Sequence, residues 1–106
     1  MCCSGNPRPK PAKFSNKNDA REVLSRFAKA LAHPVRIQIL EILKARKNCI
    51  CGELVDELPV AQATVSQHLK VLKDAGFIRG KINGSATCYC LEPSALKQFK
   101  DMSKNL

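Results

Sequence analysis

Apolar residues recur at helical spacing along much of the chain, beginning after a polar N-terminal segment. Asp19, with Glu22 three residues later, resembles a capping box, so we expect a helix to begin there. The apolar positions after it repeat every three or four residues up to Leu31. A second helix is predicted from Pro34, since proline is favoured in the first helical turn. Its apolar residues surround most of its circumference, which predicts that this helix lies at the centre of the domain.

Two further helices are predicted downstream, with a short connection between them. The first covers residues 51–58 and is ended by Pro59. The second covers residues 62–75, and Gly76 is suited to be its left-handed C-cap. Its inward stripe repeats at spacings of four and three and consists of Val65, Leu69 and Leu72.

Period-two alternation replaces the helical pattern after Gly76. Strand-like runs over residues 77–82 and 86–91 are joined by Asn83-Gly84, a strong hairpin signal. A last helix is predicted from Pro93, with one apolar side formed by Leu96, Phe99 and Met102.

Two short helices joined by a tight turn and followed by a hairpin predict a winged helix-turn-helix. The fold class is mainly α with a β-hairpin wing, and 106 residues allow one such core. We expect residues 1–18 to form a flexible basic arm and residues 19–106 to form the DNA-binding and dimerisation domain. Dimerisation is expected because the apolar sides of the first and last helices exceed what so small a core can cover.

The predicted helix over residues 62–75 is polar opposite its apolar stripe. Glutamine, serine and threonine can contact base edges in the major groove, and lysine reaches phosphates. We therefore predict that residues 61–82 bind duplex DNA, with contacts from Gln62, Thr64, Ser66, Gln67, His68, Lys70, Arg79 and Lys81. The alternative is that these side chains only solvate an exposed helix. His68 is interpreted as a surface or phosphate contact, and His33 as a helix-entry residue.

The charge balance favours the DNA interpretation. Eighteen Lys and Arg residues against nine Asp and Glu residues leave a formal charge of +9, which suits a polyanionic partner. No apolar run approaches the roughly 18–20 residues of a membrane span, and no export signal is recognisable, so we expect a cytoplasmic protein without a membrane partner. The sequence shows no Gly-rich phosphate loop, no paired carboxylates and no nucleophile–base pair, which disfavours an enzyme.

Six cysteines occur in three tight pairs: Cys2-Cys3, Cys49-x-Cys51 and Cys88-x-Cys90. In a reducing compartment, clustered cysteines indicate soft-metal ligands or redox thiols. Cys88 and Cys90 alternate along a predicted strand and share one face, a geometry that could hold a metal or a redox pair. We interpret them as packing residues. A thiol redox switch, with oxidation of Cys88-Cys90 or of Cys49-Cys51, stays open as an alternative.

At this point the sequence resembles the ArsR/SmtB family of metal-responsive repressors, over about residues 20–92. The resemblance is carried by the stretches ALAHPVR from Ala30, CICGEL from Cys49 and ATVSQHLKVL from Ala63, followed by Gly76-Phe77-Ile78. It implies a homodimer that pairs through its first and last helices, represses when metal-free and leaves DNA on binding its inducer. One subgroup binds zinc through acids and histidines of the last helix, which here has one acid and no histidine.

Another subgroup has a Cys-x-Cys at the third helix, where Cys49 and Cys51 lie. Two thiolates are few for a soft ion, and we expect Cys2 or Cys3 to supply the third sulfur. As(III) and Sb(III) favour three sulfurs, whereas Cd(II) and Pb(II) accept three or four. The adjacency of Cys2 and Cys3 favours As(III) or Sb(III) as inducer, with Cd(II), Pb(II) or Zn(II) as the alternative.

Overall fold

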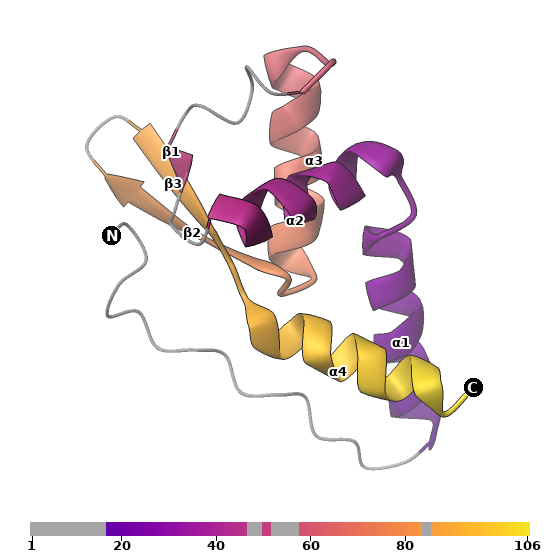
Figure 1. Ribbon diagram of the computed structural model, residues 1–106. Helices are drawn as coiled ribbons and strands as arrows, with labels where there is room; N and C mark the ends of the chain where they lie inside the picture. Colours follow the sequence, from indigo (N-terminus) through magenta and orange to yellow (C-terminus); the bar gives the residue numbers. More distant parts are fainter. Residues whose placement is uncertain (1–16, 47–49, 52–57, 84–85) are drawn as a thin grey trace.

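The computed structural model describes residues 17–46, 50–51, 58–83 and 86–106, and their side chains over 18–46, 58–80 and 88–106. In chain order, these residues form α1 (Lys17–Ala30), α2 (Pro34–Arg46), β1 (Ile50–Cys51), α3 (Gln62–Asp74), β2 (Ile78–Asn83), β3 (Ala86–Leu91) and α4 (Pro93–Lys104). Figure 1 shows the strands on one side of α2 and α3, with α1 and α4 together at the other end of the molecule. This is the winged helix-turn-helix that the sequence predicts.

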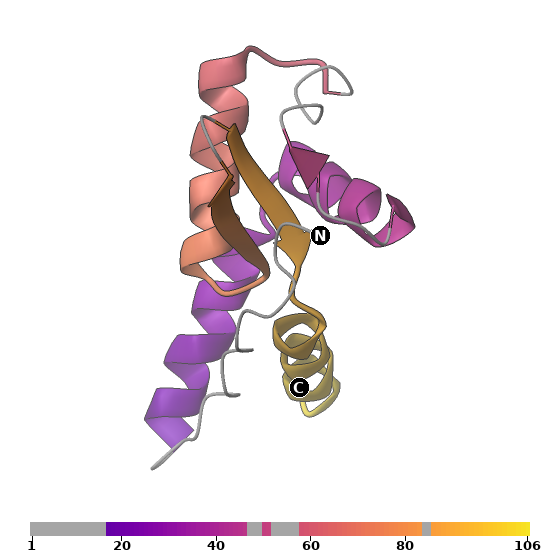
Figure 2. The same ribbon diagram turned by 90° about the vertical axis from the view of Figure 1, so that its left-hand side faces the viewer.

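The sheet joins the wing to the segment that precedes the helix-turn-helix. Its order is β1-β3-β2, with both pairings antiparallel. Figure 2 shows the sheet beside α3, and α2 contacts β3 while α3 contacts β2. The helix predicted from Cys51 is wrong at its start, because Ile50 and Cys51 pair with β3. A short apolar run cannot be assigned to helix or strand by periodicity, and here tertiary pairing decides. Residues 52–57 of that predicted helix lie outside the described residues.

Two sides of α2 differ in burial. Val35, Ile39, Leu40 and Leu43 are buried, whereas Ile37 is 40% exposed. The prediction that this helix is covered nearly all round is therefore wrong at Ile37, because the elements that contact α2 lie on its other side. At its start, His33 Nδ1 accepts a hydrogen bond of 3.1 Å from the Val35 N–H. This is an N-cap contact, which confirms His33 as a helix-entry residue.

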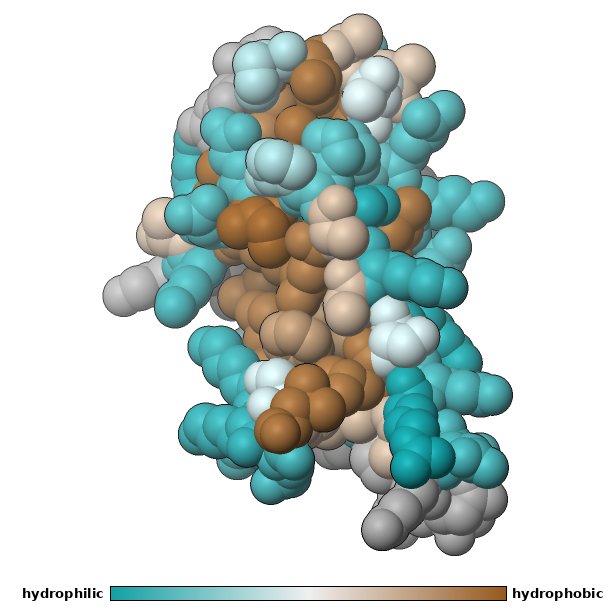
Figure 3. All heavy atoms as spheres, turned by 90° about the vertical axis from the view of Figure 1, so that its right-hand side faces the viewer, coloured by the Kyte–Doolittle hydropathy of each residue, from teal (hydrophilic) through white to brown (hydrophobic). Residues whose placement is uncertain are grey.

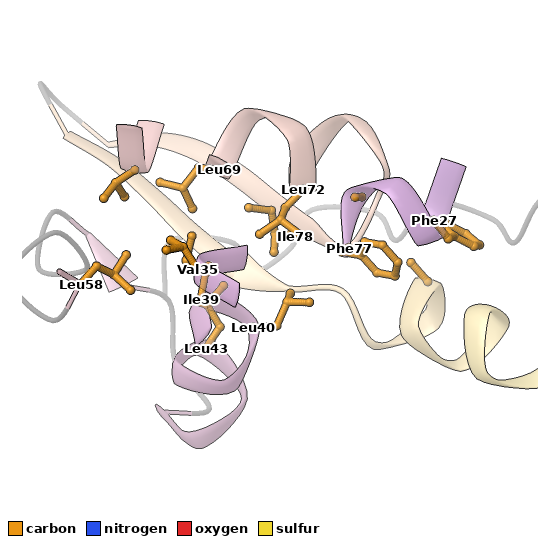
Figure 4. Close-up of a cluster of buried hydrophobic side chains, with 13 residues drawn as sticks. Phe27, Val35, Ile39, Leu40, Leu43, Leu58, Leu69, Leu72, Phe77 and Ile78 are labelled. Carbon is orange, nitrogen blue, oxygen red and sulfur yellow. The ribbon is translucent and has the colours of Figure 1, made fainter. Parts of the chain in front are cut away.

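The core runs from the helix-turn-helix to the α1–α4 end of the molecule (Figure 4). Around α2 and α3 it is aliphatic, with Ile39, Val65 and Leu72 fully buried. Toward α1 and α4 it is aromatic. The ring of Phe77 lies 5.0 Å from that of Phe27 and 6.4 Å from that of Phe99, measured between centroids. These rings connect the turn before the wing to both terminal helices.

The helix ends lie where local sequence signals predict them, except at the start of α1. α1 begins at Lys17, so Asp19 lies in its first turn instead of capping it. At the end of α3, Gly76 has φ +89°, as predicted for a left-handed C-cap. Its N–H donates to the Lys73 carbonyl, and the Phe77 N–H donates to the Leu72 carbonyl at 3.1 Å. This is a Schellman motif, and it moves the start of β2 from the predicted residue 77 to Ile78.

Glu92 connects the wing to α4. Its carboxylate is fully buried and caps α4 by accepting from the N–H and the hydroxyl of Ser94, at 3.3 and 3.0 Å. Arg79 Nε of β2 lies 3.5 Å from Glu92 Oε1. A buried charge needs such partners, because moving a charged group out of water without pairing it costs free energy. The start of α4 is therefore held against the wing.

Candidate nucleic-acid interface and thiol positions

The exposed face of α3 carries half of the predicted DNA-contacting residues. Val65, Leu69 and Leu72 are buried against the core, as the pattern predicts. The opposite positions are exposed and polar, and they include Gln62, Ser66, Gln67 and Lys70. Side chains of this type can contact base edges and phosphates from a helix in the major groove. Thr64 is half-buried, so it lies at the border of this face.

His68 lies on the side of α3 that faces the start of α2. Its ring centroid is 4.4 Å from that of His33, with the two rings tilted by 43°. Partial burial lowers the pKa of His68, and the charges of His33 and Arg36 lower this pKa further. A lowered pKa favours the uncharged form of this side chain, which lies against His33 at the start of α2.

A hollow of about 330 Å³ separates part of α3 from the wing. Ser66, Lys70 and Lys73 of α3 line one side of it, and Tyr89 of β3 lines the other. A Cβ at Gly80 would lie 3.5 Å from Lys73 Nζ and 3.3 Å from the Tyr89 ring. The glycine thus allows α3 side chains to approach the wing closely. Lys70 and Lys73 give the hollow a basic border, and the acidic Asp74 also lines it.

Arg79 and Lys81 are the two basic wing residues predicted to contact DNA, and both belong to β2. The Arg79 side chain is 22% exposed and forms the ion pair with Glu92. Lys81 stands opposite Cys88 in the β2–β3 register, and its side chain lies outside the described ones. Arg79 therefore has a structural partner, in addition to its predicted role at the DNA backbone.

The predicted ligand set Cys2, Cys3, Cys49 and Cys51 lies mostly outside the described residues, and Cys51 is described by its backbone alone. Within the side chains that are described, no three His, Cys, Asp or Glu residues converge to hold a metal ion. The sulfur chemistry of the set fits a thiophilic ion. The register of the sheet adds one fact that sequence reasoning missed, because Cys51 stands directly opposite Cys88.

Cys88 and Cys90 are buried in β3, with exposed fractions of 0% and 9%. Their burial agrees with the interpretation as packing residues. Both are also disulfide-bonded in the structure, which packing alone does not explain. The repeated Cys-x-Cys pattern was the signal that could have related the two pairs, but only the β1–β3 pairing places Cys51 opposite Cys88.

Comparison with known proteins identifies the family. A family model described as a helix-turn-helix domain matches residues 31–81. The repressor SmtB of Mycobacterium tuberculosis (strain H37Rv) is 43% identical over 89 residues, which are 84% of this chain and 61% of that protein. An uncharacterized HTH-type transcriptional regulator of Methanocaldococcus jannaschii is 32% identical over 74% of this chain and 88% of its own length.

Solved structures agree. The crystal structure of a possible transcriptional regulator for arsenical resistance matches 73% of this chain and 79% of its own, at 26% identity and a TM-score of 0.66. Among the described residues, no helix is long and apolar enough to cross a membrane. The relatives and the fold together show that the chain belongs to the ArsR/SmtB family of winged helix-turn-helix transcriptional regulators.

Proposed function

We propose that the protein is a repressor that binds operator DNA as a homodimer and leaves it when As(III) or Sb(III) binds to cysteine thiolates. The observation that carries the DNA-binding part is the exposed polar face of α3, presented by a core that buries the opposite side of the helix. The formal charge of +9 supports a nucleic-acid partner. A regulator in which the predicted inducer ligands directly precede the helix-turn-helix can couple the two binding events.

The proposed dimer pairs through α1 and α4. Apolar residues of these helices are left half-buried by the chain's own core, and they include Val23, Leu24, Leu96 and Met102. Figure 3 shows a band of hydrophobic surface on the face that carries α1 and the end of α4, bordered by hydrophilic side chains. A second copy would cover this band. It would also present two α3 helices to half-sites about 34–36 Å apart, one turn of DNA.

The inducer proposal rests on sulfur chemistry and on the relatives. Cys49 and Cys51, completed by Cys2 or Cys3, offer the soft donors that As(III) and Sb(III) prefer. One similar structure is described as a possible regulator for arsenical resistance. Cd(II), Pb(II) or Zn(II) is the alternative inducer of the same site. A thiol redox switch is a second candidate function, favoured by the disulfide-bonded state of Cys88 and Cys90.

The test uses a fluorescent operator selected from a random duplex library by the pure, reduced protein. We expect dissociation in response to As(III) and Sb(III), but little response to Zn(II). The Cys49→Ser and Cys51→Ser variants should bind DNA normally and fail to dissociate with As(III). Release by Cd(II) alone would favour the alternative inducer, and release by peroxide in the absence of metal would favour the redox switch. Failure to enrich any duplex would refute DNA-binding repression.

A further inference from the structure

The sheet places three cysteine positions next to one another. Cys88 and Cys90 are both buried and alternate along β3 with Tyr89, which is half-buried. Residues two apart on a strand lie on the same face of the sheet. Cys51, on the neighbouring strand β1, stands directly opposite Cys88. Opposed positions in an antiparallel pair also share a face, so the three positions belong to one face.

Their separations suit sulfur ligands of one small ion. Directly opposed residues have Cβ atoms about 4.5–5.5 Å apart. Residues two apart along a strand are about 6.4–6.8 Å apart at Cα. Both spacings are within the reach of cysteine side chains that converge on one atom. The two-residue strand β1 is at the edge of the sheet.

The sulfur atoms of the wing are engaged with other sulfurs, as their disulfide-bonded state shows. A packing role would explain why Cys88 and Cys90 are buried, but it would not require their sulfur atoms to bond to other sulfurs. The combination of burial, sulfur bonding and register with Cys51 indicates a built thiol cluster.

Basic residues lie opposite the wing cysteines on the other neighbouring strand. In the β2–β3 register, Arg79 stands opposite Cys90 and Lys81 stands opposite Cys88. Of these two basic residues, only Arg79 has a described side chain, and a cation near a cysteine favours the thiolate, which is the form that binds metals. Glu92 holds the Arg79 guanidinium at this edge of the wing.

We infer that Cys51, Cys88 and Cys90 form a three-sulfur site for a trivalent metalloid of the As(III) class. Two of the three sulfurs then come from the wing, in place of Cys49 and of Cys2 or Cys3. This inference rests on the proposed function, whose inducer it locates, but the site itself can be tested without DNA. Occupancy would connect β1, directly before the helix-turn-helix, to the wing strand.

The binding step is a ligand exchange without net oxidation. Three S–H bonds of the protein and three As–O bonds of As(OH)₃ break, three As–S bonds form, and three water molecules leave. Arsenic stays As(III). Disulfides must first be reduced, and an external thiol or phosphine reductant supplies two electrons and two protons for each.

The first experiment uses the wild-type protein, reduced and kept without oxygen. Arsenite is added, reactive thiols are labelled with a maleimide, and the labelled peptides are identified by mass spectrometry. We expect one As(III) per chain and protection of Cys51, Cys88 and Cys90, with Cys2 and Cys3 labelled. Protection of the arm cysteines with free labelling of Cys88 and Cys90 would overturn the inference.

Variants then measure the contribution of each sulfur to As(III) affinity. Cys88→Ala and Cys90→Ala should each weaken binding by at least about 10–100-fold, the loss found even for groups that only support a metal ligand. The Cys2→Ala/Cys3→Ala double variant should bind close to wild type. Ile78→Val, a small buried change in neighbouring β2, controls for disturbed packing. Wild-type affinity in either wing variant would overturn the inference.

Operator release separates this inference from the proposed function. If As(III) binds with the expected protection but the protein stays on its operator, the site stands and the proposed function fails. If As(III) releases the operator from the Cys88→Ala and Cys90→Ala variants as it does from wild type, the proposed function stands and the wing site fails.

Discussion

The helix-turn-helix half of the molecule, made of α2, α3 and the wing, differs from the α1–α4 half in how completely it is covered. In the first, Ile39, Val65 and Leu72 are 0% exposed, and their neighbours are aliphatic. In the second, the apolar side chains of the two helices are mostly half-buried around an aromatic cluster. The difference teaches that one chain closes its helix-turn-helix half alone, whereas the α1–α4 half leaves apolar surface that the proposed dimer would cover.

The two halves are nevertheless joined at two points. Phe77, which ends the turn after α3, packs on Phe27 of α1. Glu92 caps α4 while it pairs with Arg79 of the wing. In the proposed dimer, these contacts would connect a movement of α1 and α4 to the wing.

The largest expected effect is on the stability of the helix-turn-helix half. Leu72→Ala removes a fully buried side chain next to α2, and we expect it to lower the free energy of unfolding by about 2–5 kcal/mol. The loss per chain should be the same at every protein concentration. Urea unfolding followed by circular dichroism measures it, and Leu106→Ala, at a site 93% exposed, is the control. A loss under half a kilocalorie would mean that the core is not closed around α3.

A charge in the α1–α4 half should act on association instead of folding. Met102 is half-buried on α4, and Met102→Glu should weaken the dimer by about 2 kcal/mol or more, roughly 30-fold, as loss of a central interface contact does. Sedimentation velocity over a range of concentrations measures this effect. Lys104→Glu, on the exposed end of the same helix, should leave association nearly unchanged. An unfolded Met102→Glu chain would instead show that this side chain belongs to the chain's own core.

Changes on the exposed face of α3 should affect DNA binding and leave stability unchanged. Ser66→Ala or Gln67→Ala should cost about 1–3 kcal/mol of operator affinity and relax specificity if either contacts a base. Lys81→Ala should weaken all duplexes alike and flatten the salt dependence. Fluorescence anisotropy at several salt concentrations separates the two behaviours, with Lys104→Ala as the matched charge control. Unchanged binding in all three variants would place the DNA interface elsewhere.

The smallest expected effect is a pH dependence confined to the helix-turn-helix half. Because the pKa of His68 is lowered in the folded state, the unfolded chain binds this proton more readily. The resulting destabilisation is absent well above the unfolded value of 6.5 and grows as the pH falls through it toward the folded pKa. Thermal unfolding between pH 7.5 and 5.5 should show a modest fall in Tm that His68→Gln reduces. An equal fall in His68→Gln would assign the effect to other groups.

Local chemistry made much of the fold predictable. The stripe of Val65, Leu69 and Leu72, the C-cap at Gly76 and the start of α2 at Pro34 all depend on residues within a few positions of each other. The hairpin strands were also predicted, although β2 begins one residue later than expected.

What sequence reasoning missed depends on contacts between distant segments. The strand at Ile50–Cys51 exists because it pairs with β3, and its helical interpretation rested on local pattern alone. His68 matched a DNA-contacting position by spacing, but the approach of His33 from α2 gives it a second neighbour. Arg79 likewise has a partner in Glu92, thirteen positions away. The exposed polar face of α3 agreed with expectation because it requires no such pairing.

Tyr89 has a practical consequence for spectroscopy. The chain has one tyrosine and no tryptophan, so its intrinsic fluorescence comes from a single residue. That residue lies between Cys88 and Cys90, opposite Ile50 of β1 and Gly80 of β2. Because sulfur atoms and heavy elements quench an excited phenol at short range, the emission near this ring should change when the neighbouring thiols are oxidised or bind an ion. Arsenite can therefore be titrated into the unlabelled native protein and followed by tyrosine emission at the strand where the ligands are proposed to lie.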